Sequence, residues 1–226
     1  GTPMKVNISL KFTKGYIANP YWPELEKLIN IHKESGMNRS RTAEGRVKAL
    51  DNYLHARNLD MDAYRRLETA AERPFYRLQD LVARGDYNGR KPDEIVISAH
   101  QVYGCLVNSA QVATSGVRIS RPAQLRSEIT VVEPGLFTGK LKADGLWERF
   151  VVVTTGAGAK LSNQRALRSD PYIEKFEAQG ALVFSEAALA PERVRHFLEF
   201  AGREVGMGAS RKLAWGRFEV SKWEPV

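Results

Sequence analysis

The sequence contains a single cysteine, Cys105, and four histidines in 226 residues. One cysteine excludes an internal disulfide and a cysteine-rich zinc site. The histidines stand singly, and neither an HExxH nor a CxxC motif is present, so we expect no metal and no other cofactor. The chain also lacks an apolar run of membrane-spanning length and a recognisable signal peptide, which predicts a cytoplasmic protein that does not act on a membrane.

Acidic residues are fewer than basic ones. Lys and Arg number 34 against 26 Asp and Glu, which gives a formal net charge of +8. The 43% of hydrophobic residues is typical of a soluble globular domain, and the length suffices to bury a substantial core. The positive excess favours a polyanionic partner, and its richness in arginine favours nucleic acid, because guanidinium groups bind phosphates with two donors and stack on bases.

Hydrophobic periodicity predicts the elements of the first half of the chain. An alternating strand covers 6–12, and helical spacing follows over 24–32, after a Thr42 cap and again after Asp62. This helical block predicts an insertion over 23–92 within a single domain that spans 4–226. A short strand at 95–97 then leads into a helix over 99–113, for which Ser98 is the expected N-cap.

The second half of the chain predicts the rest of a sheet. We expect two strands joined as a hairpin, then a strand, a helix that begins at Pro191 and a closing strand; the strands cover 127–132, 149–154, 176–184 and 217–221. Without the insertion, this is the order of a βαββαβ core. We therefore predict an α+β fold, with a ferredoxin-like (RRM-like) core and a helical insertion after the first strand.

Glycines cluster near the C-terminal end, in the segment GREVGMGASRKLAWG from Gly202 to Gly216. The first three fall within seven residues and are followed by Ser-Arg-Lys and by an alternating strand, Trp215 to Val220. A glycine loop between a helix and a strand exposes backbone N–H groups, and basic side chains beside it favour a phosphate. The plainer alternative is a helix C-terminal stop with solvated charges.

One family resemblance rests on this segment. VRHFLEFAGREVGMGASRKLAWGRFEV, from Val194 to Val220, resembles the carboxyl-terminal signature of the RAMP superfamily of CRISPR-associated proteins: a helix, a glycine-rich loop with a basic residue, and a G-R-F strand. The serine-headed helix start ISAHQVYG, Ile97 to Gly104, is similar to that of the same superfamily. The resemblance implies binding of single-stranded RNA, in a row of copies or with other subunits of a ribonucleoprotein. We find no counterpart in this sequence to a catalytic aspartate of the superfamily, so we expect a non-catalytic subunit.

The residues expected to hold the RNA backbone lie in the glycine loop and in basic segments between apolar elements. They are Gly206, Gly208, Ser210, Arg211, Lys212, Arg217, Arg118, Arg121, Arg126, Lys160, Arg165 and Arg168. Each arginine taken singly could equally be a solvated charge, and Arg217 could lie on the outer face of the sheet or in a salt bridge. Taken together, these positions predict a row of arginines along the phosphates of one RNA strand.

His100 is the one weak candidate for catalysis. A histidine at a helix N-terminus is held neutral by the partial positive charge there and could act as a general base on a ribose 2′-hydroxyl, with Lys160 as the only suggestive cation. A packed or surface histidine is the plainer interpretation. The alternatives to an RNA-binding subunit are therefore a metal-independent RAMP-type endoribonuclease, a single-stranded DNA-binding accessory protein and a protein-only scaffold.

Overall fold

The fold is described from a computed structural model, which covers residues 2–155 and 162–226. The chain forms two compact units, one of residues 20–74 and one that contains everything up to Asn19 and from Phe75 onwards. Each unit has its own hydrophobic core. No helix among the described residues has the length and apolarity needed to cross a membrane.

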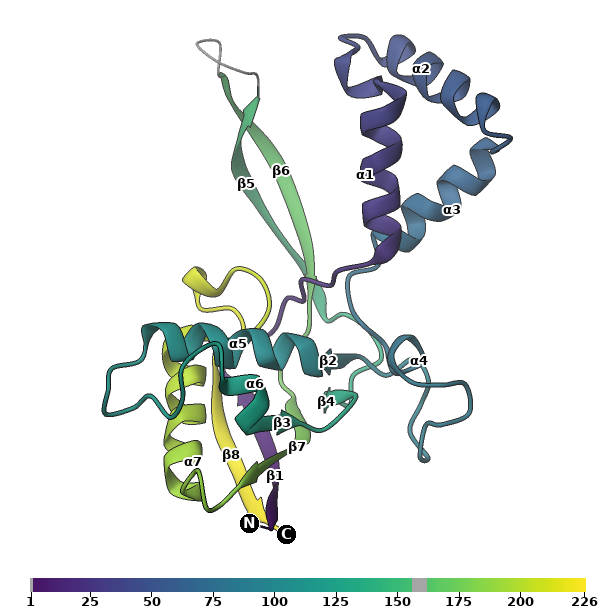
Figure 1. Cartoon of the computed structure of the whole chain (residues 1–226). Helices are drawn as coiled ribbons and strands as arrows, with labels where there is room; N and C mark the ends of the chain where they lie inside the picture. The colour runs from purple at the N-terminus through teal and green to yellow at the C-terminus, as the bar shows by residue number, and fades with distance from the viewer. Residues whose placement is uncertain (1, 156–161) are drawn as a thin grey trace. The chain divides into compact units, whose positions relative to one another are not determined.

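The larger unit is built on an antiparallel sheet. β1 (Pro3–Phe12) lies between β7 (Glu177–Ser185) and β8 (Phe218–Pro225) and pairs with both (Figure 1). The far side of β7 pairs with β3 (Ile129–Val131) and β4 (Gly135–Phe137), and β4 also pairs with β2 (Val96–Ser98). The order across the sheet is therefore β8, β1, β7 and then β3 and β4 side by side along β7. In the chain, α5 (Ala99–Val112) lies between β1 and β3, and α7 (Pro191–Phe200) lies between β7 and β8. This topology confirms the predicted ferredoxin-like core.

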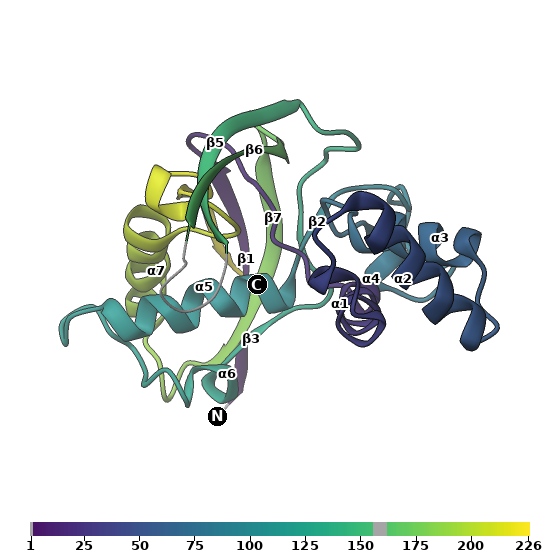
Figure 2. The same ribbon diagram turned by 90° about the horizontal axis from the view of Figure 1, so that it is seen from above.

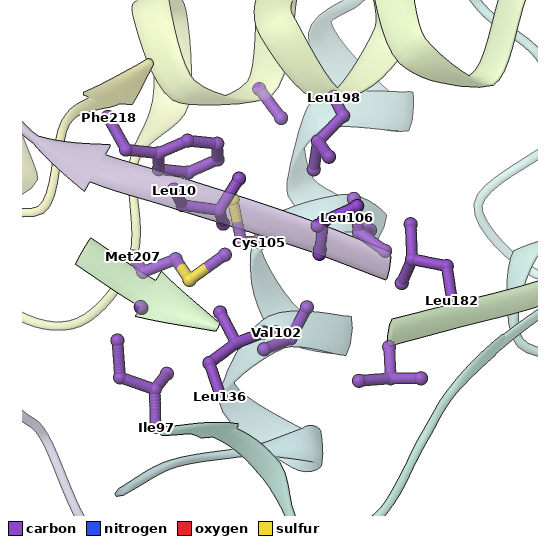
Figure 3. Close-up of a cluster of buried hydrophobic side chains, with 14 of the residues drawn as sticks. Leu10, Ile97, Val102, Cys105, Leu106, Leu136, Leu182, Leu198, Met207 and Phe218 are labelled. Carbon is purple, nitrogen blue, oxygen red and sulfur yellow. The ribbon is translucent and has the colours of Figure 1, made fainter. Parts of the chain in front are cut away.

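The core lies between this sheet and its two helices. Alternate side chains of β1, from Val6 to Phe12, are buried, as the period of two predicts. Figure 3 shows Leu10 of β1 with Val102, Cys105 and Leu106 of α5 and Leu198 of α7 in one apolar cluster. Figure 2 shows α5 running across the strands. The helices therefore cover the sheet with the apolar faces that their sequence spacing predicts.

Both core helices begin where the sequence indicates. The Ser98 hydroxyl accepts a hydrogen bond from the Gln101 amide at 3.2 Å, and the Gln101 side chain accepts one from the Ser98 amide at 3.0 Å. This capping box confirms the predicted N-cap of α5, because it satisfies two donors that the first turn leaves unpaired. Pro191 occupies the first turn of α7, where a missing N–H costs nothing.

The predicted pairing of the 127–132 and 149–154 strands is wrong. β5 (Gly145–Thr155) pairs with β6 (Ser162–Tyr172) in a separate two-stranded hairpin, while β3 pairs with β7. Residues 127 and 128 belong instead to the short helix α6 (Leu125–Glu128). Ile129 and Val131 are buried in the main core, and burial there selects β7 as the partner of this short strand.

The smaller unit consists of helices. α1 (Pro23–Ser35), the 3-10 turn η1 (Met37–Arg39), α2 (Ala43–Ala56) and α3 (Met61–Ala71) surround a core of Leu28, Leu50, Leu54 and Tyr64. The Thr42 hydroxyl caps α2, as predicted, by accepting from the Gly45 amide at 3.1 Å. α3 begins before the predicted start after Asp62, because Asp60 caps it.

Residues 75–92 lie within the expected span of the insertion, yet they are part of the larger unit. Phe75 is buried in the main core, and Leu78 begins the short helix α4 (Leu78–Leu81) and is also buried. An isolated bridge joins Arg77 to Ile95 just before β2. The compact helical unit therefore ends at Pro74.

Candidate nucleic-acid interface

The segment from Gly206 to Arg217, here called the glycine loop, connects α7 to β8. A π-helical turn, η3 (Ala201–Val205), extends α7 and ends where the Gly206 amide donates to the Ala201 carbonyl at 2.8 Å. Gly208 has a φ of +76°, and a Cβ there would lie 2.2 Å from the carbonyl oxygen of Ile17. The loop thus packs backbone against backbone, which only a residue without a side chain permits at this position.

The loop is anchored at both ends and leaves amides free between the anchors. The amides of Met207, Ala209 and Gly216 donate to carbonyl oxygens at 2.8 to 2.9 Å. By contrast, four amides in the stretch from Gly208 to Lys212 have no acceptor within the residues that the structure describes; they belong to Gly208, Ser210, Arg211 and Lys212. Four unpaired N–H groups within five residues make a place where an anion would supply the missing acceptors.

The backbone conformation at Ser210 favours a common direction for the amides of Ser210, Arg211 and Lys212. Ser210 is in the left-handed region with a φ of 57°, and the single 3-10 turn η4 (Arg211–Leu213) follows it directly. A left-handed residue next to right-handed ones turns successive N–H groups toward the same side, as in backbone nests that bind phosphate. The Lys212 side chain is exposed, and Arg211 is half-buried. Neither forms an ion pair with any described residue, so both add unneutralised positive charge beside the amides.

Arg217 holds the loop rather than extending from it. Its guanidinium donates to the carbonyl oxygens of Arg203 and Arg211, the latter at 3.4 Å. Neither interpretation from the sequence, an outward-facing side chain or a salt bridge, describes this arrangement. Because its terminal nitrogens donate to backbone carbonyls before Gly206 and after Gly208, Arg217 fixes the path of the loop.

The base of the β5–β6 hairpin lies beside the loop (Figure 1). Arg149 of β5 donates to the Asp170 carboxylate at 2.7 Å and to the Ser210 hydroxyl at 3.2 Å. Its guanidinium also stacks over the Trp147 ring, 3.8 Å from the ring centroid. Arg168 of β6 shares Asp170 at 3.1 Å, but its side chain is 55% exposed, against 19% for Arg149. Beside the loop, the hairpin therefore contributes the half-buried Arg149 and the exposed Arg168.

Aromatic rings close the C-terminal end of the loop. The ring centroid of Trp215 lies 5.2 Å from that of Trp147 and 5.1 Å from that of Tyr172. The Lys14 ammonium lies 4.8 Å above the Trp215 ring and donates to the Leu213 carbonyl at 3.1 Å. Trp215 is therefore part of the loop anchor, and the predicted strand begins later, at Phe218. These contacts join three separate segments of the chain around the loop.

Sequence reasoning missed four residues of this site: Lys14, Trp147, Arg149 and Trp215. The spacing of Trp147 and Arg149, two apart in a strand, does place both on one face. Nothing in the local pattern says what that face meets, because the contact joins positions that are 61 residues apart. The two-residue spacing therefore indicates that Trp147 and Arg149 share a face, but it does not indicate that this face contacts the glycine loop.

Several predicted arginines lie outside the glycine loop itself. Arg165 and Arg168 were expected in a loop and lie within β6, because their segment pairs with β5. Arg118 donates to the Ala113 carbonyl at 2.9 Å, at the C-terminal end of α5, and Arg126 lies 5.3 Å from the Tyr103 ring. Arg121 is exposed. None of these last three forms a hydrogen bond or ion pair with the glycine loop in the described residues, and Lys160 lies outside those residues.

The catalytic candidate has little around it. His100 is exposed in the first turn of α5, and no described residue forms a hydrogen bond with its ring. Cys105 is fully buried, and burial raises the pKa of its thiol to about 12, so the thiol stays protonated and is a poor nucleophile. In the described ranges, no three His, Cys, Asp or Glu side chains are grouped so that they could hold a metal ion.

Comparison with known proteins gives structural likeness only. No family model and no curated protein matches this sequence. Among solved structures, the cryo-EM structure of the Type III-B Cmr-beta bound to cognate target RNA is 8% identical, with a TM-score of 0.49, over 99% of this chain and 61% of that one. The crystal structure of Cmr6 from Pyrococcus furiosus is 12% identical, with a TM-score of 0.32, over 97% and 99% of the two chains. At these scores the likeness carries no argument about function.

Proposed function

We propose that this protein is an RNA-binding subunit of a CRISPR-type ribonucleoprotein and that its glycine loop holds the phosphate backbone of single-stranded RNA. The observation that carries the proposal is the set of unpaired amides from Gly208 to Lys212, with the unneutralised side chains of Arg211 and Lys212 beside them. The net charge of +8 and the resemblance of the loop segment to the RAMP signature support it.

The proposed mechanism is electrostatic and independent of base sequence. Phosphate oxygens accept from the loop amides and from Arg211 and Lys212, while the exposed Arg168 extends the contact along the hairpin. Contacts of this kind leave the base edges free for pairing with another strand. No cleavage step is part of the proposal, because His100 has no partner among the described residues that would position it or stabilise developing charge.

Exposed apolar side chains of the β5–β6 hairpin support the proposal that the protein assembles with other copies or other subunits. Four large apolar side chains of β5 and β6 are 60 to 74% exposed; they are Leu146, Phe150, Val152 and Leu167. The first three alternate along β5, and Leu167 is paired with Phe150, so all four share one face. A two-stranded ribbon has no second layer to cover such a face, and exposed apolar patches mark contacts with other molecules.

A salt titration with charge-matched variants tests the proposal. Binding of fluorescein-labelled single-stranded RNA is measured by anisotropy at several salt concentrations, for the wild type, for Arg211→Ala/Lys212→Ala and for Arg195→Ala/Lys222→Ala. The control pair removes the same charge from exposed ion pairs with Glu199 and Glu224. We expect the affinity for RNA to fall as the salt concentration rises. The slope of log affinity against log salt concentration should be smaller in magnitude by about 0.7 for each phosphate contact that the loop variant loses.

The outcomes separate the alternatives. A flat salt dependence, or equal losses in the two double variants, would overturn the loop as the RNA site. Competition with single-stranded DNA of the same sequence is expected to be weaker than competition with RNA, and the reverse order would favour a DNA-binding accessory protein. RNA incubated with the protein in chelator should stay intact; cleavage that His100→Ala abolishes would establish the endoribonuclease instead.

A further inference from the structure

Arg149 is the only charged side chain of the described hairpin that reaches the glycine loop. It donates to Asp170 on the neighbouring strand and to the Ser210 hydroxyl, and it stacks on Trp147. Arg168 contacts the same carboxylate but makes no bond to the loop. The two arginines are directly paired across the strands, yet only one of them bridges two parts of the fold.

The residue that Arg149 contacts is one of two non-glycine residues of the loop, with Ala214, whose backbone is left-handed. Ser210 has a φ of 57°, in the left-handed region that L-residues with a side chain rarely adopt. It also lies in the middle of the four unpaired amides, directly before the turn that carries Arg211 and Lys212. A conformation of this kind persists only where surrounding contacts hold it, and Arg149 supplies the side-chain contact at this position.

Arg149 is poorly placed to bind a phosphate itself. Its side chain is 19% exposed, both terminal nitrogens have partners, and one face of the guanidinium lies on an indole ring. Its charge is neutralised by Asp170 at 2.7 Å. Asp170 also keeps Arg168 as a second partner at 3.1 Å, so the main effect of the pair is to hold the Arg149 guanidinium in one orientation.

We propose that Arg149 is a positioning residue of the phosphate site: it couples the folded hairpin to the glycine loop and keeps Ser210 in the conformation that presents the free amides. The proposal rests on the proposed function, because the property that it explains is the loop's affinity for RNA. Order in the β5–β6 hairpin and phosphate binding by the loop are then linked, so that strengthening one strengthens the other.

The test uses Arg149→Ala, Ser210→Ala and the double variant in the full chain, with Arg195→Ala as the control that removes one charge from an exposed ion pair. Anisotropy with labelled single-stranded RNA is measured across a salt series. Each single variant is expected to weaken binding about tenfold, which corresponds to about 1.4 kcal/mol. The double variant should lose no more than Arg149→Ala, because both substitutions remove one interaction.

The salt slope distinguishes positioning from direct contact. Arg149→Ala should lower the affinity for RNA by the same factor at all salt concentrations. Loss of a cation that contacts phosphate would instead reduce the magnitude of the slope of log affinity against log salt concentration by about 0.7. Wild-type affinity for Arg149→Ala, additive losses in the double variant or a reduced slope would each overturn the proposal. If Arg149→Ala loses the native circular dichroism spectrum, Ser210→Ala decides, since it keeps the contacts of Arg149 with Asp170 and Trp147. Failure of the wild type to bind RNA would instead refute the proposed function.

Discussion

Replacing Gly208 by alanine is expected to lower the free energy of unfolding by about 2–5 kcal/mol. The backbone there has a φ of +76°, which costs an alanine about 1–2 kcal/mol. The new Cβ would also lie 2.2 Å from the Ile17 carbonyl oxygen and 2.7 Å from the Tyr16 ring. Relieving such overlap requires backbone movement, which costs about 1–3 kcal/mol more.

Two other glycines of the same unit separate these contributions. Gly139 has a φ of +70° with nothing within 4 Å of an added Cβ, so Gly139→Ala should cost only the conformational part, about 1–2 kcal/mol. Gly104 lies inside α5 with equally open surroundings, so Gly104→Ala should stabilise the protein by about 1 kcal/mol. The measurement is urea unfolding followed by circular dichroism. If Gly208→Ala unfolds no more easily than Gly139→Ala, close backbone packing does not hold the loop.

Two further predictions concern the core and the hairpin. Burial raises the pKa of the Cys105 thiol from its ordinary 9.0 to about 12, so between pH 9 and about 12 only the unfolded chain ionises it. Within this pH window the wild type should therefore lose stability relative to Cys105→Ala by about 1.4 kcal/mol per pH unit, and parallel pH profiles in urea unfolding would contradict this. Phe150→Ser should weaken assembly on RNA in light scattering after gel filtration, whereas Val112→Ser, which alters another exposed apolar residue, on α5, should not. Equal assembly of the two variants would remove the hairpin face from the interface.

Local patterns sufficed for much of the fold. The alternation of Val6, Ile8 and Leu10 predicts β1 because a strand buried on one face needs apolar residues at every second position. Ser98 and Pro191 predict the helix starts because each solves the problem of unpaired amides within its own first turn. The glycine loop likewise follows from its own residues, whose positive φ angles exclude most side chains.

Pairing across the chain could not be predicted in this way. The apolar run from Phe150 to Val153 indicates a strand but not its partner, so a hairpin with 127–132 was as consistent with the pattern as the observed one with β6. The same holds for charge: Arg149 and Arg217 both look like surface cations in the sequence. Tertiary contacts give each of them acceptors in the glycine loop.

The sequence by itself determined that this protein has a ferredoxin-like core, a helical block after its first strand and a basic glycine loop before its last. Those features depend on periodicity, capping and backbone freedom, which act over a few residues. Only the tertiary structure decided which amides of the loop stay unpaired and which arginines hold it in place. Those properties depend on acceptors from other parts of the chain: the carbonyls of Gly15 and Ile17 accept from loop amides, and Asp170 accepts from Arg149.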